Sequence, residues 1–137
     1  MKADCVFCKL VAKQIPASIV YEDEATLAFM DLGQVNPGHV LVACKAHAES
    51  VYALDDAQAA AVFRTAARVA RAVRDAFNPP GLSIYQANGK PAGQTVFHFH
   101  LHVLPRHDAD GMQLVWPVKN PPRERLEAYG AQIRARL

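Results

Sequence analysis

The sequence predicts an α+β domain built on an antiparallel sheet of about five strands. Short apolar segments alternate with turn residues, which is typical of strands joined by hairpins. One long segment, residues 55–77, has apolar residues at spacings of three and four, as an amphipathic helix does. The 137 residues are 51% apolar and 20% charged, which are globular values and enough chain for one core.

A short helix and a hairpin are expected at the start of the chain. Residues 5–13 carry apolar side chains on one side, and Pro16 ends this helix. Residues 19–21 and 26–30 are predicted to be strands, because the polar residues 22–24 between them favour a reversal of the chain.

A buried strand and the long helix follow. Residues 39–43 are apolar almost without interruption, and the turn residues 36–38 precede them. Asp55 or Asp56 can cap the helix, and Asn-Pro-Pro-Gly at residues 78–81 ends it. The apolar side of this helix is expected to consist of Ala59, Val62, Phe63, Ala66, Val69, Ala70, Val73 and Phe77.

The C-terminal half adds two strands and a helix. Residues 82–87 are predicted to be the fourth strand and residues 94–104 the fifth, which Pro105 ends. The loop 88–93 connects them, and residues 124–137 are predicted to be the final helix.

No linker or repeat divides the chain, so residues 1–137 are expected to be one domain, with a core at about residues 5–106 and a tail at 107–137. The net charge of +2 is too small to favour nucleic acid or a membrane as partner. No apolar segment approaches the roughly 20 residues of a membrane span. Three cysteines do not suit a disulfide framework, and the N-terminus lacks a signal-peptide pattern, so a cytoplasmic location is expected.

Residues 98–102 read His-Phe-His-Leu-His and hold three of the six histidines. In a strand, His98, His100 and His102 would share one face, and the apolar residues from Phe97 to Val103 the other. Histidine can be a nucleophile, a proton carrier or a metal ligand near neutral pH. Three interpretations remain: a solvent-facing strand, a row of catalytic side chains, or a metal site. The outer two histidines lie about 13 Å apart along an extended strand, so all three could bind one ion only if the strand were bent.

Two further patterns carry chemistry. Gln94 and Thr95 follow a loop rich in glycine, and with backbone amides and two cationic imidazoles they would suit an oxyanion such as phosphate; an ordinary hairpin turn is the alternative. Cys5 and Cys8 have the spacing of half a tetrahedral zinc site, with two buried free thiols as the alternative. Cys44 is expected to be packed in the core.

The segment from His98 to Leu104 resembles the signature of the histidine triad (HIT) family of nucleotide hydrolases and transferases, which is His-φ-His-φ-His-φ-φ with φ an apolar residue. The resemblance implies a HIT-like fold, with an antiparallel sheet, a long central helix, a short N-terminal helix and a C-terminal helix. Other parts of the family pattern occur in order, namely Asp31, Asn36-Pro37-Gly38-His39, Lys45-Ala46-His47, Asn88-Gly89 and Gly93-Gln94-Thr95-Val96.

The resemblance also implies a hydrolase acting on the α-phosphate of nucleoside 5′-phosphoramidates or related purine nucleotides. His100 would attack phosphorus and form a covalent nucleotidyl-histidine, and His102 and His39 would flank the phosphate. A dinucleoside polyphosphate hydrolase is one alternative. A nucleotide-binding or scaffold protein with little turnover, and a small module in which the histidines bind only metal, are the others.

The same resemblance implies the contacts to substrate. Asp31 would hold the ribose hydroxyls, and Asn88 would bind near the ribose or the phosphate. Gln94 and Thr95 would hold the phosphate and the leaving group. The base pocket is expected to be walled by Phe7, Phe29 and Leu32, for which core packing is the alternative.

The zinc-bearing branch of the family implies one structural zinc per chain, completed by two histidines, so the first histidine of the triad serves structure. A homodimer is also implied, with residues 55–77 as a candidate face. In the family, tails such as residues 107–137 can reach the partner's active site and shape the choice of leaving group; Trp116 could stack there or pack. The implied zinc ligands are Cys5, Cys8, His47 and His98.

Overall fold

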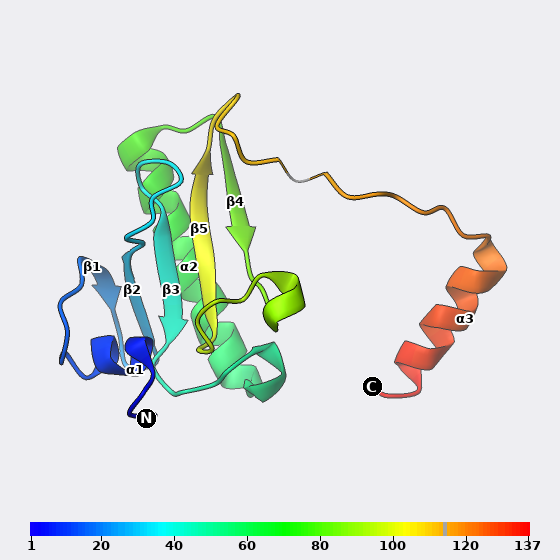
Figure 1. The fold of residues 1–137 in the computed structure, drawn as a ribbon, viewed down its shortest axis with the longest axis horizontal. Helices are drawn as coiled ribbons and strands as arrows, with labels where there is room; N and C mark the ends of the chain where they lie inside the picture. Colours follow the sequence, from blue (N-terminus) through cyan, green and yellow to red (C-terminus); the bar gives the residue numbers. More distant parts are fainter. Residues whose placement is uncertain (114) are drawn as a thin grey trace.

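The computed structural model describes residues 1–113 and 115–137, and it contains a five-stranded antiparallel sheet in the order β1-β2-β3-β5-β4 (Figure 1). This confirms the predicted α+β class. The strands are β1 (Ile19–Glu22), β2 (Thr26–Met30), β3 (Val40–Cys44), β4 (Gly81–Tyr85) and β5 (His100–Arg106). The helices are α1 (Val6–Val11), α2 (Asp56–Phe77) and α3 (Arg123–Arg134), with 3₁₀ turns η1 (Val51–Ala53) and η2 (Lys90–Ala92).

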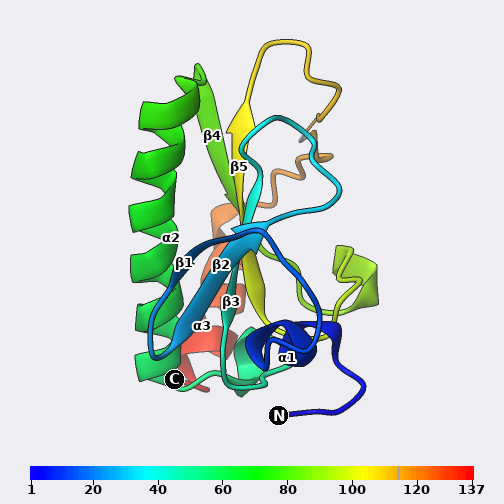
Figure 2. The same ribbon diagram turned by 90° about the vertical axis from the view of Figure 1, so that its left-hand side faces the viewer.

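Helix α2 begins and ends where its sequence predicts. Asp55 and Gln58 form a reciprocal capping box at the start, and Asn78 ends the helix in the left-handed conformation. The helix covers one face of the sheet, while α1 lies on the other (Figure 2). Phe63 and Phe77 belong to the expected apolar side of helix α2, yet they are 58% and 48% exposed.

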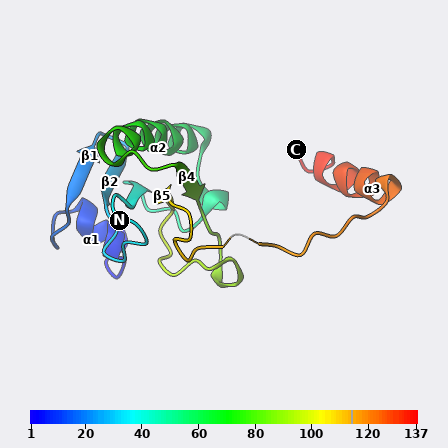
Figure 3. The same cartoon turned by 90° about the horizontal axis from the view of Figure 1, so that it is seen from above.

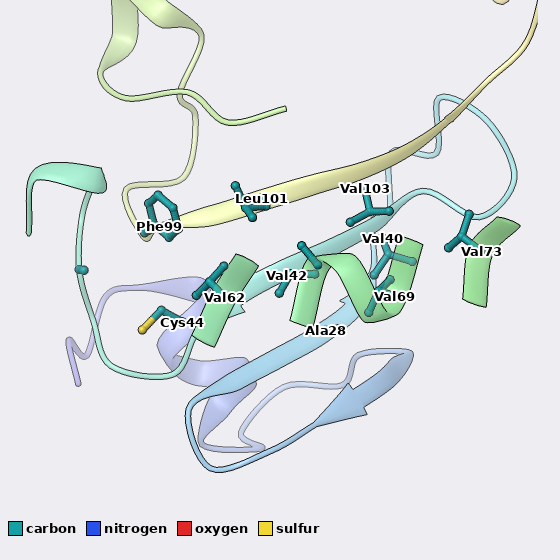
Figure 4. Close-up of a cluster of buried hydrophobic side chains, with 12 residues drawn as sticks. Ala28, Val40, Val42, Cys44, Val62, Val69, Val73, Phe99, Leu101 and Val103 are labelled. Atoms are coloured by element: carbon teal, nitrogen blue, oxygen red, sulfur yellow. The ribbon is translucent and has the colours of Figure 1, made fainter. Parts of the chain in front are cut away.

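An apolar cluster fills each side of the sheet. Successive residues of a strand face opposite sides, so β3 gives Val42 to the cluster under α2 and Leu41 to the cluster under α1. The strand is therefore buried on both faces, as its continuous apolar sequence predicts. Figure 4 shows the α2 side, where the labelled residues are Ala28, Val40, Val42, Cys44, Val62, Val69, Val73, Phe99, Leu101 and Val103.

The fifth strand begins later than predicted. Residues 94–99 lie outside the ladder, and β5 starts at His100. Because the chain turns before His100, His98 is fully buried away from the other two histidines, and Phe97 is partly exposed rather than packed in the core. The prediction of one row of three histidines on a single strand is wrong at His98.

The strand also ends later than predicted, because it runs through Pro105 to Arg106. Pairing with β3 stops at Val103, so a proline at position 105 removes no hydrogen bond on that side. Its carbonyl on the same side accepts a hydrogen bond of 2.8 Å from the Asn36 side chain. Pro105 is therefore compatible with the sheet, because β3 no longer pairs with β5 at this position.

Helix α3 stands apart from the sheet (Figures 1 and 3). Its predicted presence is confirmed, yet none of residues 123–134 is buried. Leu126, Tyr129 and Ile133 form an exposed apolar stripe along it, and Trp116 on the connecting segment is exposed too. Within residues 1–113 and 115–137, every helix is too short or too polar to cross a bilayer.

Candidate functional site

Four metal-ligating side chains from distant parts of the sequence meet beside α1. The Cys5 Sγ atom lies 3.3 Å from His98 Nδ1, and Cys8 Sγ lies 3.4 Å from His47 Nδ1 and 3.7 Å from His98 Nδ1. All four ligand atoms lie within 4.8 Å of one another. A tetrahedral zinc ion with bonds of about 2.0–2.3 Å needs ligands about 3.3–3.8 Å apart, so the spacing fits zinc.

The hydrogen bonds of His98 also suit a metal ligand. Its Nε2 lies 2.6 Å from the carbonyl oxygen of Cys44, and because a carbonyl only accepts, Nε2 carries the proton. The lone pair is therefore on Nδ1, which faces the two thiols. Burial lowers the pKa of His98 and favours the neutral ring that metals bind.

His100 has the opposite tautomer, although it is two residues away. Its Nδ1 donates to the carbonyl oxygen of His98 at 2.6 Å, which leaves the lone pair on Nε2. Burial lowers the pKa of His100, so the ring is neutral near pH 7. The ring of Phe7 packs edge-on against it with centroids 5.0 Å apart. A neutral, oriented imidazole of this kind can act as a nucleophile.

A chain of hydrogen bonds links Val35, His39 and His102. The Val35 amide donates to His39 Nδ1 at 3.4 Å, so the proton of a neutral His39 lies on Nε2, which is 2.9 Å from His102 Nδ1. His102 then accepts at Nδ1 and carries its own proton on Nε2. Burial, reinforced by His100 and His39, lowers the pKa of His102 to about 4. Burial also lowers the pKa of His39, so the expectation of two cationic imidazoles is wrong for the free protein.

The carboxylate of Asp31 completes this group at the end of β2. Its Oδ2 lies 3.4 Å from His39 Nε2 and 3.8 Å from His102 Nδ1. Its Oδ1 accepts a hydrogen bond from the Gly33 amide at 2.8 Å, which fixes the orientation of the group. The carboxylate and the two rings therefore share one small polar region.

His100, His102 and Asp31 line a cavity of about 310 Å³ whose other walls are largely apolar. Four more of the predicted substrate-binding residues lie on its wall: Phe7, Phe29, Thr95 and Leu32, the last of them fully exposed at the rim. Sequence reasoning missed the wall made by residues 15–18, because it treated Ile15-Pro16-Ala17 only as the end of a helix. The cavity is polar at the histidine end and apolar elsewhere, as a site for a nucleotide would be.

Gln94 and Asn88 lie outside this lining and hold loops in place. The Gln94 side chain is buried, accepts from the Gly89 amide at 2.7 Å and donates to the carbonyls of Glu49 and Val96 at 2.6 and 3.1 Å. Asn88 accepts from the Val51 amide at 2.8 Å. In the free protein, both side-chain amides form hydrogen bonds to the main chain of the segments before α2 and before β5.

Sequence reasoning also missed Gln34. Its Nε2 donates to the carbonyls of Asp31 and His39, both at 2.6 Å, while its Oε1 accepts from the amides of Gly38 and His39 at 3.1 and 3.0 Å. One side chain therefore closes the loop that carries Asp31 and His39. No local sequence pattern marks a glutamine for this role, since its three partners, Asp31, Gly38 and His39, depend on the path of the loop.

Comparison with known proteins finds a family profile and individual relatives that agree with one another. The HIT domain family profile matches residues 12–109. Protein hit of Bacillus subtilis is 48% identical over 114 residues, which are 82% of this chain and 79% of that protein. Adenosine 5′-monophosphoramidase hnt1 of Schizosaccharomyces pombe is 31% identical over 134 residues, which are 97% of this chain and 98% of that protein.

Solved structures agree in fold. A HIT family protein from Bacillus anthracis matches with a TM-score of 0.96 and 39% identity, over 100% of this chain and 99% of that one. A zinc-bound histidine triad family protein from Mycobacterium smegmatis matches with a TM-score of 0.76 and 35% identity, over 98% of each chain.

Proposed function

This chain belongs to the HIT domain family, and from that premise we propose that it hydrolyses nucleoside 5′-phosphoramidates or related purine nucleotides at the α-phosphate. The S. pombe relative carries the name of an adenosine 5′-monophosphoramidase, which supports this substrate class. The observation that carries the proposal is the 2.6 Å hydrogen bond from His100 Nδ1 to the His98 carbonyl, which directs the Nε2 lone pair away from the strand.

The proposed reaction has two displacements. The Nε2 lone pair of His100 attacks the α-phosphorus, the bond to the amine nitrogen breaks, and the amine leaves with a proton taken up from solvent. A water molecule then attacks the same phosphorus and gives up a proton to solvent, the bond to Nε2 breaks, and the nucleoside 5′-monophosphate leaves. The carbonyl of His98 stabilises the positive charge that the ring of His100 carries between the two steps, because it accepts the Nδ1 proton throughout.

The neighbouring residues are assigned to substrate binding. His102 presents an N–H at Nε2, since its Nδ1 is occupied by His39, and this N–H donates to a phosphate oxygen. Asp31 accepts from the ribose hydroxyls, and Phe7, Phe29 and Leu32 form the wall for the base. Thr95 lines the same cavity and is assigned to the phosphate and the leaving group.

Turnover of adenosine 5′-phosphoramidate, beside a dinucleoside polyphosphate, tests the nucleophile. The wild type is expected to release adenosine 5′-monophosphate, and His100→Ala to lose at least about a thousandfold in rate, because it lacks the attacking group. The faster of the two substrates distinguishes the phosphoramidase from the polyphosphate hydrolase. Mass spectrometry of the quenched wild type is expected to find the nucleotidyl group on His100.

The matched control is His107→Ala, because His107 is an exposed histidine beyond the end of β5. Its rate is expected to equal that of the wild type. Turnover by His100→Ala at the wild-type rate contradicts the assignment of the nucleophile. Binding of nucleotide by the wild type without turnover contradicts the enzyme and favours the binding or scaffold protein.

We also propose that Cys5, Cys8, His47 and His98 hold one structural zinc ion. The fit of their spacing and the tautomer of His98 support this, together with the zinc-bound M. smegmatis relative. When bound, zinc supplies a rigid cross-link between residues far apart in the sequence. Cys5, Cys8 and Cys44 form no disulfide with one another, which supports a reducing, cytoplasmic compartment.

A homodimer completes the proposal. The apolar stripe of Leu126, Tyr129 and Ile133 on α3 has no covering element in the described part of the chain. A second copy of the chain would bury this stripe, as two-fold interfaces bury matching surfaces of both subunits. In Figure 1, helix α3 extends away from the sheet, so a second chain could pack against its apolar stripe.

A further inference from the structure

Asp31, His39 and His102 bring three metal-ligating atoms together, apart from the Cys5 and Cys8 cluster. The distances between the atoms are 2.9, 3.4 and 3.8 Å. A tetrahedral ion with bonds of about 2.0–2.2 Å needs ligands roughly 3.3–3.6 Å apart, and the three distances bracket that range. We propose that these residues form a second, exchangeable site for a divalent cation of the zinc type, and that the bound ion inhibits turnover; the inhibition rests on the proposed function.

The ligand set selects the class of ion. Two imidazole nitrogens and one carboxylate oxygen suit zinc, cobalt and their neighbours, whereas magnesium and calcium prefer oxygen ligands throughout. Within residues 1–113 and 115–137 the group offers three ligand atoms, and two of its residues, Asp31 and His102, line the cavity, so a solvent molecule can take the fourth position. An open site with three ligands exchanges its ion more readily than the closed site with two cysteines and two histidines.

The hydrogen bonds of the free protein are already close to those of the bound state. The Nδ1 atom of His102 has its lone pair directed into the group, and the Gly33 amide orients the carboxylate of Asp31. Only His39 has to change its tautomer, since its proton moves from Nε2 to Nδ1. This change removes two hydrogen bonds, the 2.9 Å bond from His39 Nε2 to His102 Nδ1 and the long 3.4 Å bond from the Val35 amide, and the two nitrogen–metal bonds replace the first of them.

Binding of the ion would engage two groups that the proposed function assigns to the nucleotide. The metal would hold His102, which otherwise donates to the phosphate, and would withdraw Asp31 from the ribose. His39 would bind the metal instead of Nδ1 of His102. Because ion and nucleotide need the same side chains, each is expected to weaken the binding of the other.

Cobalt binding to the full-length chain tests the site without turnover. Cobalt held by thiolates absorbs through sulfur-to-metal charge transfer, whereas cobalt held by nitrogen and oxygen shows only weaker d–d bands. The wild type is expected to bind one more ion per chain than His102→Gln or Asp31→Asn, and this extra ion adds d–d absorption without charge transfer. The control His107→Gln keeps the extra ion. Equal stoichiometry in wild type and His102→Gln overturns the site.

Competition tests the inhibition. Adenosine 5′-monophosphate is expected to displace the extra cobalt ion from the wild type, a result that needs no turnover. Zinc is expected to lower kcat/KM for adenosine 5′-phosphoramidate at least about tenfold, with reversal by a chelator and weaker inhibition at higher nucleotide concentration. Unchanged or faster turnover with the second site filled overturns the inhibition. Absence of turnover without added metal overturns the proposed function instead, while the cobalt and displacement measurements still decide the site and the competition.

Discussion

At the scale of single residues, main-chain carbonyls decide which ring nitrogen carries the proton in His98 and in His100. The carbonyl of Cys44 accepts the Nε2 proton of His98 and leaves Nδ1 free for the proposed metal. The carbonyl of His98 accepts the Nδ1 proton of His100 and leaves Nε2 free for the proposed attack on phosphorus. His98 thus takes part in both sites, with its ring in one and its carbonyl in the other. Loss of metal is therefore expected to disturb the nucleophile as well as the fold.

Removal of the metal tests this connection. A chelator, or the substitution Cys8→Ser, is expected to lower the Tm of the protein by roughly 10 °C, because an ion present at about a thousand times its Kd stabilises by about 4 kcal/mol. Thermal melting followed by circular dichroism measures the change. The chelator should leave the Tm of Cys8→Ser unaltered, and an unchanged Tm for the chelated wild type would contradict a structural metal.

Gln34 is expected to matter for turnover more than for stability. The substitution Gln34→Ala removes the four hydrogen bonds that close the Asp31–His39 loop, yet this side chain is exposed to solvent, so the stability loss is expected to be about 1–2 kcal/mol. Misplacement of His39 and Asp31 is expected to lower kcat/KM about tenfold. Steady-state kinetics and urea unfolding of Gln34→Ala measure the change in kcat/KM and the change in stability, with Gln132→Ala on α3 as the control. An equal loss of kcat/KM in the two variants would contradict a role of Gln34 in positioning Asp31 and His39.

At the scale of elements, helix α2 reaches the site through its last residue. Phe77 lies against Gly38, the residue before His39, and a Cβ atom added at Gly38 would lie 2.8 Å from the Phe77 ring. Gly38 also has φ of +93°, a conformation that residues with side chains rarely adopt. The last residue of the helix therefore fixes the position of Gly38, the residue at which the loop leads into His39 and then β3.

The substitution Gly38→Ala tests this contact against a matched control. Gly111 has a similar φ of +79° but nothing within 4 Å of an added Cβ, so Gly111→Ala carries only the backbone strain. Gly38→Ala is expected to lose about 1–3 kcal/mol more stability than Gly111→Ala, because the Phe77 ring has to move. Urea unfolding gives both values, and equal losses would show that the ring gives way freely.

At the scale of the whole molecule, the chain divides into a sheet with two covered faces and an arm, helix α3, in which none of residues 123–134 is buried. Residues 6–106 hold both apolar clusters and all of the ladder, whereas α3 lies apart from them (Figure 1). Such an arm gains stability only from another surface, since an isolated helix of this length is marginal in water. This is the physical reason for the proposed second copy of the chain.

Disruption of the arm's apolar stripe tests the homodimer. The wild type is expected to sediment at twice the mass of one chain, and Ile133→Glu, which places a charge in the stripe, is expected to shift it towards a single chain. Gln132→Glu adds the same charge beside the stripe and is the control. Analytical ultracentrifugation measures the masses; a wild type of one-chain mass contradicts the homodimer.

The sequence by itself determined the local elements. The capping box and the apolar spacing predict α2, the turn residues predict the hairpin of β1 and β2, and alternation predicts that His100 and His102 share a face, because each of these depends on neighbours within a few residues. The family pattern further supplied the four residues of the metal cluster. These features needed no knowledge of how distant segments meet.

Only the tertiary structure decided the remainder. The removal of His98 from the histidine strand, the continuation of β5 through Pro105 and the internal hydrogen bonds of Gln94 all depend on groups more than forty positions away or on the path of a loop. The tautomer of His98 depends on the carbonyl of Cys44, which lies beside its Nε2 although it is 54 positions away in the sequence. The same holds for the meeting of Asp31, His39 and His102, since β3 and β5 have to pair before those atoms can converge.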